Sequence, residues 1–371
     1  MHPPGDPASR SAALTRAVRR RARDQTLQVA LVVPLQGPAG IFGPSCEASA
    51  RFAVDEINAG SGVLGRELRL AVVDGGQPPE RVADEVDALV SARAVDAVVG
   101  WHISAVRHEV APRTAGRVPY VYTALYEGGE RTPGVFLTGE TPDRQLFPAM
   151  RWMAEQLGVR RWCIVGDDYV WPRASARAVR RYAERLGVTV CGEVYVRLGA
   201  EDYDKSLAAV ERSRPEGVLM LLVGADGVQF NRAFAARGLH EQIVRLSPLM
   251  DESMLLATGT EGTAGLYATA GFFESLGTDS SLRFLLGYAR CHGLQAPAAT
   301  TMGESCYEGL RLFAELCRRA GDTHVSSLCA VADRTGYDGP RGAVHLHDRH
   351  LCQPVYVARA DGLEFEVLDQ L

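Results

Sequence analysis

The sequence lacks the motifs that the common enzyme classes require. It has no GxSxG nucleophile elbow, no HExxH zinc motif and no GxxxxGK[ST] phosphate loop. The glycine-broken loop at residues 36–44 lacks the GxGxxG order of a dinucleotide fingerprint. His102 and His108 lie near Ser104, but the sequence places no acid that would clearly orient either histidine as a base. We therefore predict a protein that is not an enzyme and needs no cofactor.

Cysteine and histidine also lack the spacing of a metal site. The eight cysteines are scattered without a CxxC pair, and free thiols in this number are typical of a reducing compartment. His345, His347 and His350 cluster near a strand-like stretch. Because no cysteine or acid accompanies them at a fixed spacing, we interpret them as surface residues and expect no metal.

Long apolar runs are missing too, and no window approaches the length of a membrane span. Residues 1–24 are rich in Pro, Ala and Arg. They run directly into the first expected strand, without the apolar segment and cleavage site of a secretory signal. We expect a disordered basic tail over residues 1–25 and a cytoplasmic protein with no membrane contact. The formal net charge of −5 also argues against direct nucleic-acid binding, which needs a basic surface.

What the sequence does contain is a long alternation of strand-like and helix-like segments, which predicts parallel sheets covered by helices on both faces. The pattern is too long for one sheet. It divides into a series of strands up to about residue 138 and a second series from about residue 161. Residues 343–347 and 352–359 alternate apolar and polar side chains, which predicts antiparallel strands. The other strands are expected at residues 29–34, 68–73, 97–100, 120–123, 161–165, 189–196, 217–222 and 265–269.

Aromatic and hydroxyl side chains gather where three of these strands end, at residues 101–104, 122–129 and 166–172. Because the carboxyl ends of parallel strands face one crevice, we expect these three loops to meet there. Tyr and Trp offer large apolar faces with one polar handle each. Ser104, as a helix N-cap, would add an oxygen beside free backbone N–H groups. The pattern predicts a site for a small neutral ligand, although the same aromatics could instead pack the two halves together.

At these residues the chain resembles a known family, the type I periplasmic binding proteins of the branched-chain amino acid, urea and amide group. The resemblance begins at residues 33–38 and 53–66 and continues in order to the C-terminus. Within the group, residues 126–128 and 168–173 resemble most the AmiC-like amide sensors, which are cytoplasmic negative regulators of aliphatic amidase expression.

The resemblance implies an α/β fold of two Rossmann-like lobes, each a parallel sheet flanked by helices. A hinge of three crossovers, expected near Thr141, Gly271 and Gly339, would let the lobes close on a ligand. The expected division is an N-terminal lobe of residues 26–141 plus 272–338 and a C-terminal lobe of residues 142–271 plus 339–371.

The resemblance also implies which side chains bind the ligand. Some depart from the amide-sensor pattern, since His102 and Trp171 replace tyrosines. Ala124 replaces a threonine and Leu125 a proline. The implied ligand-binding set is His102, Ser104, Tyr122, Ala124, Leu125, Tyr169, Trp171 and Leu249.

Leu249 bears on the ligand class. It stands where amino-acid binders of the family place an acid for the ligand ammonium, so α-amino acids are disfavoured. A shift of two residues would bring Asp251 to that position instead. The implied ligand is a small neutral polar molecule, such as a short aliphatic amide or urea.

The leading hypothesis from sequence is a cytoplasmic sensor of such a ligand. Ligand binding would close the lobes and change the affinity for a partner, which the resemblance identifies as an RNA-binding transcription antiterminator. The alternative is the solute-binding protein of an ABC importer for amides, urea or branched-chain amino acids, which would need export. A homo-oligomer stays open under both hypotheses.

Overall fold

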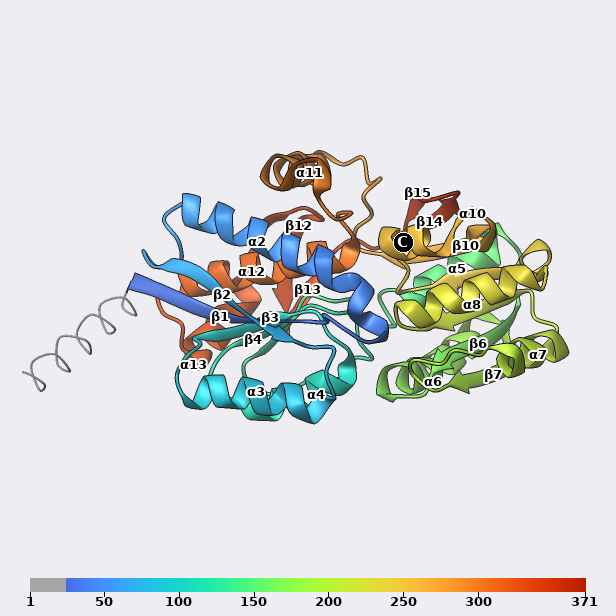
Figure 1. Cartoon of the computed structure of the whole chain (residues 1–371), viewed down its shortest axis with the longest axis horizontal. Coiled ribbons are helices and arrows are strands. Elements are labelled where there is room, and N and C mark those ends of the chain that lie inside the picture. The colour runs from blue at the N-terminus through green and yellow to red at the C-terminus, as the bar shows by residue number, and fades with distance from the viewer. Residues whose placement is uncertain (1–24) are drawn as a thin grey trace, which may run out of the picture.

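The computed structural model describes residues 25–371, which form two α/β lobes side by side (Figure 1). The N-terminal lobe holds an eight-stranded sheet and the C-terminal lobe a seven-stranded one. This architecture confirms the predicted fold class. The predicted basic tail, residues 1–25, lies outside the described residues except for Gln25. Within residues 25–371, no helix combines the length and apolar character needed to cross a membrane.

The N-terminal sheet is parallel except at one end, where β11, β12 and β13 pair antiparallel. Its strand β1, which lies between β3 and the edge strand β2, is almost entirely buried, as expected for a strand covered on both faces. In spatial order the strands are β11 (Gly336–Gly339), β12 (Gly342–His347), β13 (His350–Cys352), β5 (Val135–Leu137), β4 (Tyr120–Tyr122), β3 (Ala97–Gly100), β1 (Thr26–Val33) and β2 (Glu67–Asp74).

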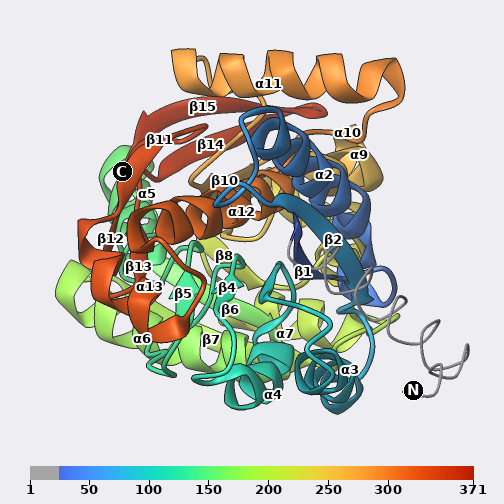
Figure 2. The same ribbon diagram turned by 90° about the vertical axis from the view of Figure 1, so that its left-hand side faces the viewer.

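Helices cover both faces of this sheet (Figures 1 and 2). One face carries α2 (Gly43–Ala59) packed against α12 (Thr301–Ala320), with α11 (Asp279–His292) outside α2. The other face carries α3 (Pro79–Ser91) and α4 (Ser104–Thr114). The short α13 (Val325–Val331) packs on α12.

The C-terminal sheet is also parallel except at one end, where β14 pairs antiparallel with β10 and β15. A turn at Gly362 and Leu363 joins β14 to β15, and Gly362 has φ of 64° there. In spatial order the strands are β15 (Glu364–Gln370), β14 (Tyr356–Asp361), β10 (Leu266–Ala270), β9 (Val244–Ser247), β8 (Gly217–Leu221), β6 (Arg161–Asp167) and β7 (Thr189–Val196).

The helices of the C-terminal lobe include pairs that pack on each other. One pair is α5 (Leu146–Gln156) with α6 (Val170–Leu186). Arg237, which follows α8 (Ala225–Ala236), forms ion pairs with Asp204 and Glu211 of α7 (Asp204–Ser213). The others are α9 (Glu252–Thr258) and α10 (Thr260–Thr263), which contact α8.

The chain passes between the sheets at residues 138–145, 271–278 and 353–355. The prediction of a third crossover near Gly339, with residues 339–371 in the C-terminal lobe, is wrong for residues 339–352. These residues form β12 and β13, which extend the N-terminal sheet through the pairing of His350 with Leu137. The strand expected at residues 352–359 is likewise broken at residues 353–355, where the chain crosses.

Candidate ligand-binding site

The loops at the ends of β3, β4, β6 and β9 meet at a small cavity between the two lobes, with a volume of about 10 Å³. This is room for about one water molecule, so the walls of the two lobes lie nearly in contact in this form. All eight predicted side chains lie on the cavity wall, and Trp101 and Ile103 join them. The wall comprises Trp101, His102, Ile103, Ser104, Tyr122, Ala124, Leu125, Tyr169, Trp171 and Leu249.

His102 is a fully buried, neutral wall residue. Its Nε2 is 2.8 Å from Tyr120 Oη, and its Nδ1 is 3.3 Å from the Ile103 carbonyl oxygen. Burial, with a smaller contribution from the charge of Arg107, lowers the pKa of His102 to about 3 against the opposing effect of the Ile103 bond. Tyr122 Oη donates to the His102 carbonyl oxygen at 2.8 Å. The Tyr122 hydroxyl hydrogen is therefore already used within the protein.

Ser104 is the residue that offers an unused polar atom to the cavity. The prediction that Ser104 is the N-cap of a helix is wrong, because Ile103 holds that position with extended backbone and Ser104 is the first residue of α4. Ser104 is 2% exposed, and its Oγ has no hydrogen-bond partner among residues 25–371. A buried hydroxyl without a partner costs free energy that a ligand can recover.

The C-terminal lobe contributes an aromatic and aliphatic wall. The rings of Tyr169 and Trp171 lie 6.3 Å apart at 42°, and Leu249 is buried beside them. Asp251 does not line the cavity. It is the N-cap of α9, where Oδ1 accepts from the backbone N–H of Met254 at 2.9 Å. The cavity wall thus contains no carboxylate that could bind a ligand ammonium.

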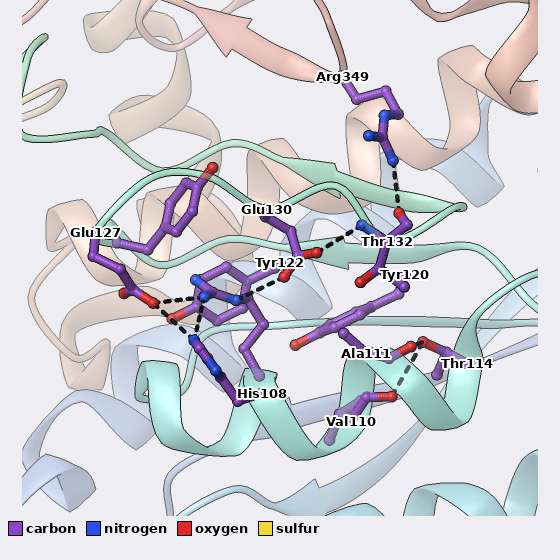
Figure 3. Close-up of polar contacts among 12 residues, drawn as sticks. His108, Val110, Ala111, Thr114, Tyr120, Tyr122, Glu127, Glu130, Thr132 and Arg349 are labelled. Carbon is purple, nitrogen blue, oxygen red and sulfur yellow. Dashed lines mark hydrogen bonds and ion pairs between the residues drawn. The ribbon is translucent and has the colours of Figure 1, made fainter. Parts of the chain in front are cut away.

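An ion cluster, buried except for His108, lies directly behind Tyr122 (Figure 3). The Arg107 guanidinium is 5.2 Å from the centre of the Tyr122 ring and 2.7 Å from Glu127 Oε1. Its Nε is 3.1 Å from Glu130 Oε2. His108 Nε2 is 2.9 Å from Glu127 Oε1, so the expectation that no acid orients His108 is wrong. The basic and acidic partners of each contact lie 19 or more positions apart in sequence, which explains why spacing did not reveal the cluster.

The lobes touch each other on both sides of the cavity. The short 3₁₀ helix η1 (Pro38–Phe42) contacts α8 and α9, and α4 contacts α6. A β-carbon added at Gly224 would lie 2.2 Å from the Pro38 carbonyl oxygen. The structure is therefore a closed form, in which Pro38 rests against the backbone of Gly224.

Gly224→Ala is expected to block this closed form, because the added methyl group cannot coexist with the Pro38 carbonyl at that distance. Ligand affinity should fall roughly tenfold or more, since the closed state becomes the minor one. Small-angle scattering with ligand should show a radius of gyration that stays at the open value. Gly199→Ala is the matched control: Gly199 also has positive φ, but its added β-carbon would lie 3.4 Å from Pro38 Cγ. Equal effects of both variants would contradict the prediction.

Among residues 25–371, no three or more His, Cys, Asp or Glu side chains come together in a way that could hold a metal ion. All eight cysteines are free thiols, and four of them are buried. Of the three clustered histidines, His347 and His350 are cross-strand partners in the β12–β13 pair. His350 hydrogen-bonds to Tyr126, whereas His345 and His347 are exposed on β12.

Comparisons with known proteins agree with this architecture. A family model described as periplasmic binding protein matches residues 26–364. The Leu/Ile/Val-binding protein BraC3 of Rhizobium johnstonii is 24% identical over 334 residues, 85% of each chain. The Leu/Ile/Val-binding protein homolog 3 of Brucella melitensis is 19% identical over 314 residues, 84% of this chain and 83% of the relative.

Solved structures of similar fold include two with bound ligands. A solute-binding protein of an ABC transporter from Rhodopseudomonas palustris BisB5, in complex with 3,4-dihydroxybenzoic acid, has a TM-score of 0.83 at 20% identity and covers 94% of this chain and 97% of its own. The branched-chain amino acid transporter substrate-binding protein of Streptococcus pneumoniae, in complex with isoleucine, has a TM-score of 0.81 at 16% identity. The match covers 92% of this chain and 99% of that protein. With the family match over residues 26–364, the chain belongs to the periplasmic binding protein family.

Proposed function

We propose that this protein is the solute-binding component of an ABC importer and that its ligand is a small uncharged molecule with one polar end. The observation that carries the proposal is the closed cavity itself. It combines aromatic rings from both lobes with the unpartnered Ser104 hydroxyl, and its wall contains no ionised group. Such a lining suits an apolar body with a single hydrogen-bonding group.

The importer function is favoured over the amide-sensor function because the similar proteins are named as binding or transport proteins. The two curated relatives are named as Leu/Ile/Val-binding proteins, and the two solved structures belong to ABC transporters. An amide sensor that controls an antiterminator would use the same cavity. Cell fractionation separates the two: protein outside the cytoplasmic membrane supports the importer, and protein retained in the cytoplasm contradicts it.

The charge around the cavity argues against both ionic ligands that these relatives bind. An amino acid such as isoleucine would bring an ammonium, for which the wall offers Leu249 and no acid. A benzoate would bring a carboxylate close to Glu127 and Glu130, whose two charges exceed the single charge of Arg107. An uncharged ligand incurs neither cost.

Isothermal titration with acetamide, propionamide, benzamide, urea, benzoate and isoleucine tests this ligand class. We expect heat from at least one uncharged compound and weaker binding of benzoate and isoleucine. Tyr169→Ala should lower the affinity for whichever compound binds roughly 10–100-fold, because it removes a large apolar face of the cavity. Tyr195→Ala, a half-buried tyrosine of the same lobe away from the cavity, is the control. Tightest binding of isoleucine would refute the ligand class.

A further inference from the structure

The place where Pro38 of the N-terminal lobe rests on the C-terminal lobe is built on two buried carboxyl groups. Pro38 lies against Gly224 and beside Gly199, whose added β-carbons would come within 2.2 Å and 3.4 Å of it. Asp167 Oδ2 accepts from the backbone N–H of the residue before Gly224 at 2.8 Å. Asp226 Oδ2 accepts from the backbone N–H of Gly199 at 2.7 Å. Each carboxyl therefore holds one of the two backbone positions that receive Pro38.

The two carboxyl groups lie close together and have no cation. Asp226 is in the first turn of α8, where its backbone N–H donates to the carbonyl oxygen of Val223, whose own N–H binds Asp167. Both aspartates are buried, and neither forms an ion pair within residues 25–371. The second oxygen of Asp167, Oδ1, has no hydrogen-bond partner in the same part of the chain. A second negative charge here would thus be both buried and poorly bonded.

The groups around this carboxyl pair supply no positive side chain. The hydroxyls of Tyr169 and Tyr203 face it, and η1 contains no charged residue. Glu201, which lines the same groove as Asp226, adds negative charge. The N-terminus of α8 favours one anion, but two adjacent buried carboxylates repel each other, so one of them holds a proton. In agreement, burial and the charge of Asp226 raise the pKa of Asp167 to about 9.

Closure of the lobes makes a second charge more costly. Asp226 lines its groove together with Gly37 and Pro38 of the N-terminal lobe, so opening of the lobes uncovers the groove. Water can then solvate a charge on the carboxyl pair. The open form therefore ionises at lower pH than the closed form, and closure takes up a proton in the pH range between the two.

We propose that the closed form requires a proton on the pair of Asp167 and Asp226, and that release of this proton at alkaline pH opens the lobes. This control of closure goes beyond the proposed function, because it acts on the lobes whether or not a ligand is bound. Where both forms hold the proton, the ratio of closed to open molecules does not depend on pH. The ratio falls as the pH rises through the range in which only the closed form is protonated.

Single-molecule energy transfer between dyes on the two lobes measures this ratio in the whole, ligand-free protein. Exposed positions for the dyes are Glu85 on α3 and Arg212 on α7. In the wild type, the ratio of closed to open molecules should fall at least about fivefold between pH 7 and pH 9.5. In Asp167→Asn, the amide oxygen still accepts from Val223, but the side chain cannot ionise. The ratio should then change less than about twofold over the same range.

Asp168→Asn is the matched control, because Asp168 is the next residue but is half exposed and pairs with Arg173 at 2.8 Å. It should keep the wild-type fall. In Asp226→Asn the neighbouring negative charge is lost, so Asp167 should ionise at lower pH and the fall should level off at lower pH. A wild-type ratio that does not change with pH, or a fall of equal size in Asp167→Asn, overturns the inference. The ligand titrations above decide the proposed function independently of this result.

Discussion

Replacing Arg341 by methionine is expected to lower the free energy of unfolding by about 3–5 kcal/mol, the cost of leaving buried charge unpaired. Arg341 is completely buried, and its Nε lies 2.5 Å from Glu304 Oε2. Its Nη1 is 3.5 Å from Glu140 Oε1 and donates to Gln353 Oε1 at 2.7 Å. Methionine fills a similar volume but leaves these carboxylates without a cation.

The same residue connects the three crossovers of the hinge. Glu140 lies on the first crossover and accepts from the backbone N–H of Gly271, on the second, at 2.8 Å. Gln353, on the third, donates to the Thr138 carbonyl oxygen at 3.0 Å. Arg341 contacts both Glu140 and Gln353, so its loss should also weaken the fixed relation between the lobes.

Chemical denaturation followed by tryptophan fluorescence measures the loss of unfolding free energy. The signal reports on both lobes, because Trp152, Trp162 and Trp171 lie in the C-terminal lobe and Trp101 in the N-terminal lobe. Arg341→Lys is the control. It keeps the charge but cannot serve Glu304, Ser305 and Gln353 at once, so an intermediate loss is expected. A loss below about 1 kcal/mol in Arg341→Met would show that the buried pair is not needed for stability.

Much of the fold could be predicted because its signals are local. Each parallel strand is a short apolar run, and each covering helix repeats its apolar residues within a few turns. The prediction failed at residues 339–352, where β12 and β13 are short and alternate apolar and polar residues. The sequence pattern of such strands does not indicate which of the two sheets they join. The pairing of His350 with Leu137, which decides the matter, links residues more than two hundred positions apart.

The cavity wall was predictable for a related reason. The carboxyl ends of parallel strands in one sheet lie at the same edge, so the residues that follow β3 and β4 were expected to meet. The loop after β6 belongs to the other sheet, and the family resemblance, with a ligand bound between two lobes, brought it to the same site. The groups behind the wall were not predictable. Arg107 and Glu127 meet through the packing of α4 against the loop after β4, and Arg341 meets Glu304 between a hairpin and a helix. Neither pair has a spacing that a sequence pattern records.

The burial of Glu308 leads to the second large effect, which depends on pH. Glu308 is fully buried in α12, and neither carboxylate oxygen has a hydrogen-bond partner within residues 25–371. Burial, together with the nearby charge of Glu304, raises the pKa of Glu308 to about 8 against the opposing charges of Arg341 and Arg311. Burial likewise raises the pKa of Glu304 to about 7, although Arg341 opposes this.

The sign of the effect follows from proton binding. Between the ordinary carboxyl pKa and about pH 8, the folded protein retains the Glu308 proton while the unfolded chain has released its own. Stability therefore decreases as pH rises through this window, and above pH 8 the full cost of a buried, poorly paired charge is present. Below the window both states are protonated and the group has no effect.

Glu308→Gln removes this charge while keeping the shape of the side chain beside Gly339, where a β-carbon would lie 2.2 Å from Glu308 Oε1. We expect the variant to be about 2–4 kcal/mol more stable than the wild type at pH 9 and no more stable at pH 5. Thermal unfolding from pH 5 to 9 measures the difference. Glu315→Gln, on the same helix but paired with Arg318, should leave the pH dependence unchanged. If Glu308→Gln gave an equal gain at both pH values, the buried proton could not be the cause, and better packing of the amide against Gly339 would explain the result instead.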